Sequence, residues 1–383
     1  MLHVTEPRRL RSPVPASTLA ITDITTDAAL LGSFEAHERI WLGRDEERGL
    51  TAIVAVHNTA LGPALGGTRV WPHASFEAAL TDALRLSRGM TLKAAIAGVP
   101  FGGGKAVIVA DPKTEKTPAL LEAYAEMLAA LDGQYYTGED VGLTLADADY
   151  LRARTQNVTG TTQGGSGNPS PVTAHGVFLG LKAAFAHRTG RASLSGVCVA
   201  VQGLGSVGWA LCQHLYEAGA SLIVADIDEE RTAKAALAFR AEAMPADKIV
   251  VAEADIFAPC ALGGVLNVDT IPLLKATVVA GAANNQLARH EDGELLAERG
   301  VLYAPDFVIN AGGLINVAAE LDPDGYDRKR VMAKLEQIPA TLAEIFAAGD
   351  RLGSSTADVA LEMAGQRIAR ARKVDSREAK RFA

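Results

Sequence analysis

The sequence contains little cysteine, no long apolar run and no excess of positive charge. Its three cysteines, Cys198, Cys212 and Cys260, are too few and too far apart for a disulfide framework or a zinc knuckle, so we expect no metal site. No run of about 18 apolar residues occurs, so we expect no membrane span. The formal net charge of −8 disfavours nucleic-acid binding, since proteins that bind nucleic acids are usually basic.

The two ends differ in composition from the rest of the chain. Residues 1–18 contain three prolines and three arginines but lack the apolar region of a signal peptide, so we expect disorder there and a cytoplasmic protein. Residues 367–383 carry seven Lys or Arg against two acidic residues. We interpret this basic tail as a solvated, frayed helix, and the alternative is an electrostatic contact with an acidic neighbouring subunit.

The segment 197–226 has the pattern of a dinucleotide-binding unit. A buried strand, the fingerprint Gly203-x-Gly205-x-x-Gly208, a helix and a second strand that ends at Asp226 follow one another. The glycines allow a tight turn, close approach of a pyrophosphate and close helix–strand packing, while the helix N-terminus offers N–H donors. Asp226 can accept hydrogen bonds from an adenosine ribose and would repel a 2′-phosphate, which favours NAD over NADP.

The alternation of predicted strands and helices indicates an α/β fold with two domains. We expect residues 19–158 to form an N-terminal domain for substrate binding and oligomerisation. Residues 159–325 are expected to form a Rossmann-type domain with a doubly wound parallel sheet and right-handed crossovers. Residues 326–383 are expected to add C-terminal helices that pack back toward the first domain. The Gly- and Ser-rich segment 160–170 is the candidate hinge.

Local patterns predict further elements inside these domains. A helix capped by Ser75 is expected to end near Gly89, because the apolar spacing of three and four is clear up to that point. Other predicted helices cover residues 117–131 and 173–185, and predicted strands cover residues 40–42, 50–57, 249–251, 265–266, 277–280 and 301–303.

Two lysines, Lys93 and Lys105, stand in apolar, glycine-rich surroundings, where lysine is seldom found unless it is paired. Gly104-Lys105 does not belong to a phosphate loop, because Ala106 stands where Ser or Thr should hold magnesium. One ammonium can hold a substrate carboxylate as a point charge. The other, next to a like charge and partly desolvated, is expected to have a lowered pKa and to activate water. Asp140 is the natural second proton carrier.

Seven motifs resemble, in this order, those of the Glu/Leu/Phe/Val dehydrogenases, and most of all the leucine and phenylalanine dehydrogenase branch. They lie at residues 62–69, Lys93, 102–105, 138–142, 203–208, 281–286 and 310–316. The resemblance covers roughly residues 35–370. It implies a homo-oligomeric enzyme that converts an L-amino acid, NAD+ and water reversibly into a 2-oxo acid, ammonia and NADH.

The resemblance also implies roles for single residues. Lys93 is expected to bind the substrate carboxylate with the help of Gly66 and Gly67, Lys105 to be the general acid/base that activates water, and Asp140 to handle the amino-group proton. Other substrate contacts are expected at Leu65, Gly138, Asn284, Leu314 and Val317. We assign the cofactor contacts to Arg69, Thr173, Gly203, Leu204, Gly205, Ser206, Val207, Gly208, Asp226, Ile227, Arg231, Ala261, Leu262, Ala283, Asn284 and Asn310.

The pocket residues leave the substrate side chain open. In the family, leucine-type members tend to have alanine at the position of Gly138 and valine at that of Val317, whereas phenylalanine-type members tend to have glycine and leucine. This chain mixes the two patterns. We favour a branched aliphatic substrate, with phenylalanine or another aromatic amino acid as the alternative. Glutamate is disfavoured, because no extra cation stands at these positions to pair with its second carboxylate.

Two other classes of function remain as alternatives. One is a catalytically silent NAD-binding regulator, against which the pair of lysines with Asp140 argues. The other is a 2-hydroxy-acid dehydrogenase, which would use a histidine base with a carboxylate partner, and His175 lacks an obvious acid in the sequence. A zinc alcohol dehydrogenase is excluded because its Cys and His ligands are absent from the sequence.

Overall fold

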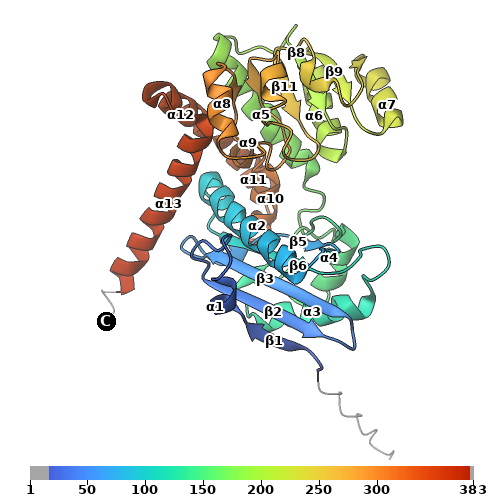
Figure 1. The fold of residues 1–383 in the computed structure, drawn as a ribbon, viewed down its shortest axis with the longest axis vertical. Coiled ribbons are helices and arrows are strands. Elements are labelled where there is room, and N and C mark those ends of the chain that lie inside the picture. The colour runs from blue at the N-terminus through green and yellow to red at the C-terminus, as the bar shows by residue number, and fades with distance from the viewer. Residues whose placement is uncertain (1–16, 380–383) are drawn as a thin grey trace, which may run out of the picture.

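A computed structural model describes residues 17–379, which form two α/β domains followed by helices that return from the second domain to the first (Figure 1). The disorder expected for residues 1–18 falls outside the described residues, apart from Ser17 and Thr18. The Ser17 hydroxyl donates to Glu126 at 2.9 Å, and the Thr18 hydroxyl donates to Asp45 at 2.8 Å. Within the described part of the chain, no helix is long and apolar enough to span a membrane.

The first domain is built on a seven-stranded mixed sheet with the order β1-β2-β3-β6-β4-β7, in which β5 also pairs with β6. The strands are β1 Ala20–Asp23, β2 Arg39–Asp45, β3 Leu50–Asn58, β4 Ala64–Leu65, β5 Thr68–Val70, β6 Gly102–Ile108 and β7 Tyr135–Tyr136. The four strands β1, β2, β3 and β6 pair antiparallel, whereas β4 and β5 run parallel to β6. The predicted strands at residues 40–42 and 50–57 are therefore present, and each is longer than predicted.

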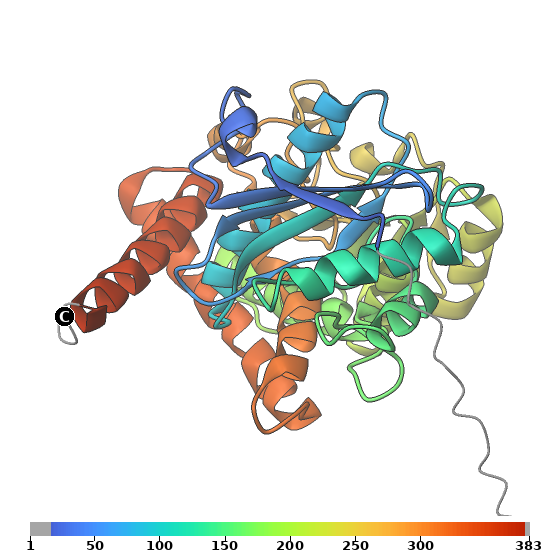
Figure 2. The same cartoon turned by 90° about the horizontal axis from the view of Figure 1, so that it is seen from below.

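Helices cover both faces of this sheet (Figure 2). One face packs against α1 (Thr25–Ala28) and α2 (Phe76–Ala97), and the other packs against α3 (Pro118–Ala130) and α4 (Leu145–Arg152). Successive side chains of a strand point to opposite faces of the sheet. Because both faces are covered by helices, the sequence of β3 is an almost continuous apolar run.

The helix that begins after Ser75 does not end near Gly89, as predicted, but continues to Ala97. Gly89 weakens the helix by only about 1 kcal/mol relative to alanine, and the buried face on both sides of it outweighs that cost. The helix ends where Gly98 adopts a left-handed conformation with φ of 63°. This correction places Lys93 on α2.

The second domain is built on a six-stranded, fully parallel sheet with the order β10-β9-β8-β11-β12-β13, as predicted for a doubly wound fold. The strands are β8 Cys198–Gln202, β9 Ser221–Ala225, β10 Glu242–Ala243, β11 Ile256–Pro259, β12 Val278–Val279 and β13 Leu302–Tyr303. The strand predicted at residues 249–251 is wrong, because Ile249–Val251 forms a 3-10 helix, η1. The strand predicted at residues 265–266 is reduced to a single bridge between Leu266 and Leu287. Short apolar runs do not distinguish these states.

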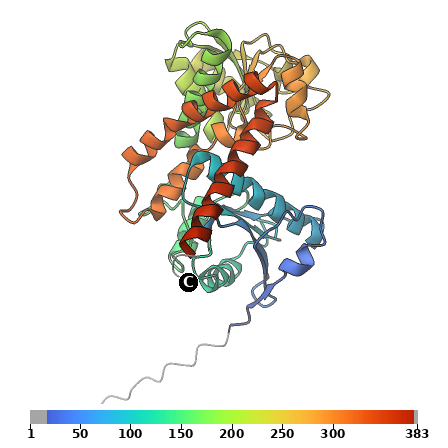
Figure 3. The same cartoon turned by 90° about the vertical axis from the view of Figure 1, so that its left-hand side faces the viewer.

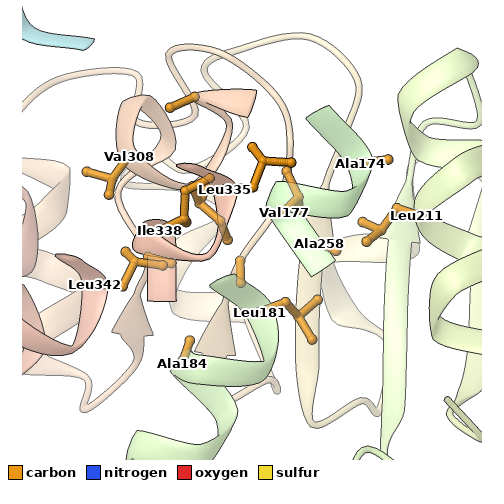
Figure 4. Packing of buried hydrophobic residues seen from close by; sticks show 14 of the residues in the cluster. Ala174, Val177, Leu181, Ala184, Leu211, Ala258, Val308, Leu335, Ile338 and Leu342 are labelled. Carbon is orange, nitrogen blue, oxygen red and sulfur yellow. The ribbon is translucent and has the colours of Figure 1, made fainter. Parts of the chain in front are cut away.

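The helices of the second domain other than α8 share one core with the C-terminal helices, and α5 lies at its centre (Figure 4). Figure 4 shows residues of α5 packed toward α6 on one side and toward α11 and α12 on the other. The helices are α5 Ser170–Thr189, α6 Ser206–Glu217, α7 Glu229–Phe239, α8 Asp292–Glu298, α9 Asp306–Ile309, α10 Gly312–Ala318, α11 Arg328–Leu335, α12 Gln337–Leu352 and α13 Thr356–Ala379, with 3-10 turns at η2 Ile271–Leu273 and η3 Ala319–Leu321.

The last helix, α13, runs from the second domain back along the first (Figure 3). The Arg367 guanidinium donates to the carbonyl of Ile96 at 2.6 Å, and the Lys334 ammonium donates to the carbonyl of Gly98 at 2.9 Å. Two cations therefore cap the C-terminal end of α2, where the carbonyl groups lack helical partners and the helix dipole is negative. Of the basic tail, Arg372 also lies 3.9 Å from Glu38, while residues 380–383 fall outside the described residues.

Candidate active site

The strand β6 directs Lys105 to the face of the sheet that α2 covers. Val107 of β6 belongs to the hydrophobic cluster that contains Leu80 and Leu84 of α2. Residues two apart on a strand share a face, so Gly103 and Lys105 point to this same side of the sheet. A Cβ atom on Gly103 would overlap Thr91 of α2. The glycine therefore lets α2 approach the strand closely, which brings the helix that carries Lys93 next to Lys105.

Lys105 forms an ion pair with Asp140. Its Nζ lies 2.7 Å from Oδ2 of Asp140, and Lys105 is only 6% exposed. Arg69 approaches the same oxygen at 3.4 Å and also pairs with Asp82 at 2.9 Å. Burial alone would raise the pKa of Asp140, but Lys105 and Arg69 outweigh burial and hold it below its ordinary value. The carboxylate is therefore held in its charged form, which can accept a hydrogen bond from a bound amine.

A lowered pKa was expected for the lysine that activates water, which is Lys105 by the resemblance. The structure instead gives a lowered pKa for Lys93, the lysine expected to bind the carboxylate. Burial lowers the pKa of Lys93 to about 8, and the nearby charge of Lys105 acts in the same direction. Asp306 and Asp140 oppose this effect. Asp306 is the first residue of α9, which packs against α2 from the second domain. The Lys93 ammonium therefore lies at the boundary of the two domains.

The glycine pair Gly66-Gly67 lies between these groups. A Cβ atom on Gly66 would overlap the carbonyl of Gly104, and one on Gly67 would lie 2.6 Å from the carbonyl of Glu139 and 3.0 Å from Cβ of Asp140. Only glycine fits at both positions, so the backbone itself lines the site. The structure thus brings together Lys105, Asp140 and the glycine pair.

The fingerprint of the second domain has the local shape that a dinucleotide requires. Gly203 adopts φ of 93°, and a Cβ atom on Gly208 would overlap the Gly203 carbonyl, so both glycines are needed for the turn. In contrast, nothing lies within 4 Å of a Cβ atom on Gly205, and this glycine leaves room in front of the loop. The helix α6 begins at Ser206, and its first N–H groups follow Gly205 directly.

Asp226 lies beside this loop. Its Oδ2 accepts a hydrogen bond from the Leu204 N–H at 2.6 Å, and its Oδ1 accepts one from Asp228 at 2.9 Å. Ile227 and Leu262 are 93% and 86% exposed, which is unusual for large apolar side chains and suits a ligand that covers them. Other assigned cofactor residues with exposed positions are Gly205, Ser206, Arg231 and Ala261, and Val207 is half-buried.

Near the domain boundary, the side chains of Asn284 and Asn310 meet. The amide nitrogen of Asn310 donates to Oδ1 of Asn284 at 2.8 Å, while the Oδ1 of Asn310 is buried and has no partner within the described residues. Such a buried acceptor is suited to a ligand donor such as a carboxamide. Thr173, at the start of α5, lies next to Gly313 of α10, and Ala283 is buried behind Asn284. These observations fit the nicotinamide end of a dinucleotide.

The predicted pocket residues also lie close together. Leu65 and Leu314 are buried in the same hydrophobic cluster, and Val317 packs against it. Val317 Cγ1 would lie 3.7 Å from a Cβ atom on Gly160, and Thr159 would lie 3.3 Å from one on Gly138. Thr159 and Gly160 therefore lie between Gly138 and Val317, the two positions at which this chain combines a phenylalanine-type glycine with a leucine-type valine.

Arg69 and His175 differ in their surroundings from what the sequence indicated. Arg69 was assigned to the cofactor, but its described partners are Asp82 and Asp140 of the first domain, so a cofactor contact stays a prediction. The His175 ring contacts the ring of His214 at a centroid distance of 5.3 Å, in an aromatic cluster of α5 and α6.

Three residues near the site were missed in the sequence. Asp306 faces Lys93 from the second domain. Glu320 accepts hydrogen bonds from the backbone N–H groups of Gly160 at 2.9 Å and Ser166 at 2.8 Å, and so fixes the candidate hinge segment. Tyr135 donates its hydroxyl to Gly66. The tyrosine directly precedes the Asp140 motif, but nothing in the sequence indicates its contact.

Comparison with known proteins agrees with this geometry. Residues 37–157 match the family model described as Glu/Leu/Phe/Val dehydrogenase, dimerisation domain, and residues 223–375 match that of Glutamate/Leucine/Phenylalanine/Valine dehydrogenase. Leucine dehydrogenase of Geobacillus stearothermophilus is 51% identical over 342 residues, which cover 89% of this chain and 93% of the relative. Phenylalanine dehydrogenase of Bacillus thermotolerans is 43% identical over 354 residues, or 91% of this chain and 92% of the relative.

A solved structure has the same fold. The crystal structure of L-tryptophan dehydrogenase from Nostoc punctiforme superimposes with a TM-score of 0.77 at 45% identity, and the match covers 88% of this chain and 97% of that one. The two-domain fold, the ion pair of Lys105 with Asp140 and these matches agree. The chain belongs to the Glu/Leu/Phe/Val dehydrogenase family and is an amino-acid dehydrogenase.

Proposed function

We propose that this enzyme catalyses the reversible, NAD-dependent oxidative deamination of a branched-chain aliphatic L-amino acid, with leucine as the favoured substrate. The observation that carries the proposal is the arrangement of Lys93 and the Lys105–Asp140 pair at the boundary with the fingerprint domain. The 51% identity to a leucine dehydrogenase supports the choice of substrate class. We assign the substrate to the first domain, residues 19–158, and the cofactor to residues 159–325, with residues 326–383 as the returning helices.

In this proposal the first-domain residues bind the substrate and move its protons. The Lys93 ammonium and the backbone of Gly67 hold the substrate carboxylate, and Asp140 accepts a proton from the amino group. Because Lys105 is paired with Asp140, the two groups act on neighbouring atoms of the substrate. Lys105 takes a proton from the water that attacks Cα and returns it as ammonia leaves. Orientation of the Cα–H bond toward the second domain follows from these anchors.

NAD+ is the proposed cofactor and would supply the hydride acceptor when bound. The open space at Gly205 and the first N–H groups of α6 suit its pyrophosphate, and Asp226 suits a ribose with a free 2′-hydroxyl. The exposed side chains of Ile227 and Leu262 are the proposed flanks of the adenine. Asn284, Asn310 and Thr173 are proposed to contact the nicotinamide end.

The side-chain pocket supports an aliphatic substrate over an aromatic one. A Cβ atom on Gly138 would already lie 3.3 Å from Thr159, so the methyl group missing at Gly138 opens little space. Tryptophan and phenylalanine dehydrogenases are also relatives, at 46% and 43% identity against 51% for a leucine dehydrogenase, so the aromatic alternative is not favoured. A homo-oligomer is proposed from the dimerisation-domain match, and a cytoplasmic location stays a prediction.

The proposal is tested with a panel of L-amino acids and NAD+, in which NADH absorbance is followed for the wild-type protein and for Lys105→Ala. The expected result is the highest kcat/KM with leucine, valine or isoleucine, and a rate near background for Lys105→Ala. A preference for phenylalanine or tryptophan would overturn the substrate class. Unchanged activity of Lys105→Ala would overturn the assigned chemistry.

A further inference from the structure

The hydroxyl group of Tyr135 lies directly behind the glycine pair. It donates to the carbonyl of Gly66 at 2.6 Å and lies 3.2 Å from the carbonyl of Gly67. Tyr135 is completely buried, and its ring packs against Gly104, where a Cβ atom would lie 2.7 Å from the ring. Tyr135 thus contacts both the glycine pair and the residue that precedes Lys105.

In the peptide group that joins Gly66 to Gly67, the carbonyl is hydrogen-bonded within the protein and the N–H is free to bind a ligand. Its carbonyl belongs to Gly66, which is buried and accepts the Tyr135 hydrogen bond. Its N–H belongs to Gly67, which is partly exposed, and within residues 17–379 this N–H has no acceptor. The neighbouring N–H groups are occupied, since Gly66 donates to Tyr136 at 3.1 Å and Thr68 donates to Gly138 at 3.0 Å.

The free N–H lies in the same region as Lys93. Met90 lies 3.2 Å from the Cβ position of Gly66, and Met90 and Lys93 are three residues apart on α2, so they share a helix face. Asp140 contacts the Cβ position of Gly67. The Gly67 N–H and the Lys93 ammonium are therefore placed as two donors for one carboxylate.

We propose that Tyr135 is a positioning residue for substrate binding, whose hydroxyl polarises the Gly66–Gly67 peptide and makes the Gly67 N–H a stronger donor to the substrate carboxylate. The inference rests on the proposed amino-acid dehydrogenase function. Hydrogen bonds in a chain strengthen one another, and the effect is larger where water is excluded.

A chain of buried hydroxyl groups begins at Tyr135. The Thr137 hydroxyl lies 3.3 Å from that of Tyr135 and 2.5 Å from that of Thr68, which in turn lies 2.5 Å from that of Tyr124. A phenol has one proton, and the Gly66 carbonyl at 2.6 Å is closer than the Gly67 carbonyl at 3.2 Å or the Thr137 hydroxyl at 3.3 Å, so we assign the proton to the Gly66 hydrogen bond. Burial raises the pKa of Tyr135 well above its ordinary value, which keeps this donor protonated.

The test compares Tyr135→Phe with Tyr124→Phe. Both tyrosines are completely buried, and both variants remove one hydroxyl from the same chain, so a purely structural effect would be similar in the two. Only Tyr135 contacts the glycine pair, whereas Tyr124 reaches it through Thr68. The measurements are kcat and KM for L-leucine, KM for NAD+, and the inhibition constant of 4-methylpentanoate, a substrate analogue without the amino group.

For Tyr135→Phe we expect KM for leucine and the inhibition constant of 4-methylpentanoate to rise about two- to threefold, because one hydrogen bond in a chain strengthens the next by about 10–30%, with little change in kcat or in KM for NAD+. Tyr124→Phe is expected to leave these constants unchanged. Equal constants for Tyr135→Phe and wild type, or an equal rise in both variants, would overturn the inference. Inactivity of the wild-type protein would instead overturn the proposed function.

If Tyr135→Phe does not fold, Thr137→Val takes its place. This change removes a competing acceptor of the Tyr135 proton and leaves the Gly66 contact in position. The inference then predicts that KM for leucine is unchanged or lower and that kcat is unchanged. A rise in KM for leucine or a fall in kcat contradicts it.

Discussion

The Nζ of Lys105 lies 2.7 Å from Oδ2 of Asp140, although the two residues are 35 positions apart and reach the site from the strand β6 and from the loop after β7. Arg69 approaches the same carboxylate from the side and is held in turn by Asp82. The Asp140 carboxylate therefore has one cation, Lys105, in close contact and a second cation, Arg69, at longer range. This arrangement keeps Asp140 charged and Lys105 fixed in direction.

We expect Asp140→Asn to lower kcat/KM for leucine by about 10²- to 10⁴-fold, because a positioned proton acceptor contributes about this factor. NADH binding, followed by fluorescence, should be unchanged. Asp82→Asn is the matched control, since Asp82 reaches the pair only through Arg69. A loss in Asp82→Asn as large as that in Asp140→Asn would show that charge around the pair, rather than proton transfer at Asp140, limits the rate.

The pKa of Lys93 predicts how carboxylate binding depends on pH. Burial lowers this pKa to about 8, and only the protonated lysine attracts a carboxylate. The inhibition constant of 4-methylpentanoate should therefore be constant below about pH 8 and rise above it. This inhibitor has no amino group that titrates in the same range.

Two variants test the assignment of this pH dependence. In Lys93→Arg the charge persists, so the rise should disappear from the accessible range. In Asp306→Asn the negative charge that raises the pKa of Lys93 is lost, so the rise should begin at a lower pH. An inhibition constant that rises at the same pH in all three proteins would contradict the assignment to Lys93.

The charge of Asp226 is expected to exclude NADP+. Asp226→Asn keeps an acceptor for the Leu204 N–H but removes the negative charge that a 2′-phosphate would meet. The ratio of kcat/KM for NADP+ to that for NAD+ should rise about tenfold, which corresponds to about 1.4 kcal/mol. Asp228→Asn, which removes the same charge at the N-cap of α7, should change this ratio much less. An equal effect of both variants would mean that net charge alone selects the cofactor.

Gly138→Ala is expected to narrow the side-chain pocket. The new Cβ atom lies 3.3 Å from Thr159, so Thr159 must shift by a few tenths of an ångström. We expect kcat/KM for phenylalanine to fall more than that for leucine, and their ratio to change by less than about tenfold, because glycine already opens little space at this position. Gly365→Ala on α13 is the control, because nothing lies within 4 Å of its Cβ position. An unchanged ratio would place the substrate side chain elsewhere.

Much of the fold could be predicted from the sequence, because its signals are local. The fingerprint Gly203–Gly208 and Asp226 lie within one strand–helix–strand unit, and Gly203 and Gly208 have steric reasons that hold in the structure. The end of α2 was missed because Gly89 resembles a helix stop, whereas tertiary packing carries the helix through it. Residues 249–251 were missed because a buried apolar triplet suits either a strand or a 3-10 turn.

Part of the site could not be predicted, because its contacts join residues far apart in the chain. Glu320 binds the backbone of Gly160 across 160 positions, and Tyr135 binds Gly66 across 69. Neither belongs to a motif with a chemical signature, since a carboxylate or phenol on a helix or strand usually has a structural role. The effect of Asp306 on the pKa of Lys93 could not be predicted for the same reason, because it depends on how the second domain packs against α2.

The central claim is that this chain removes the amino group of an aliphatic L-amino acid while it reduces NAD+. The most direct measurement incubates the wild-type protein with L-leucine and NAD+ and quantifies NADH, ammonia and 4-methyl-2-oxopentanoate in the same sample. The account predicts equal molar amounts of all three products, and none of them with Lys105→Ala. Formation of NADH without ammonia, or of none of these products with leucine, valine and isoleucine alike, would contradict it.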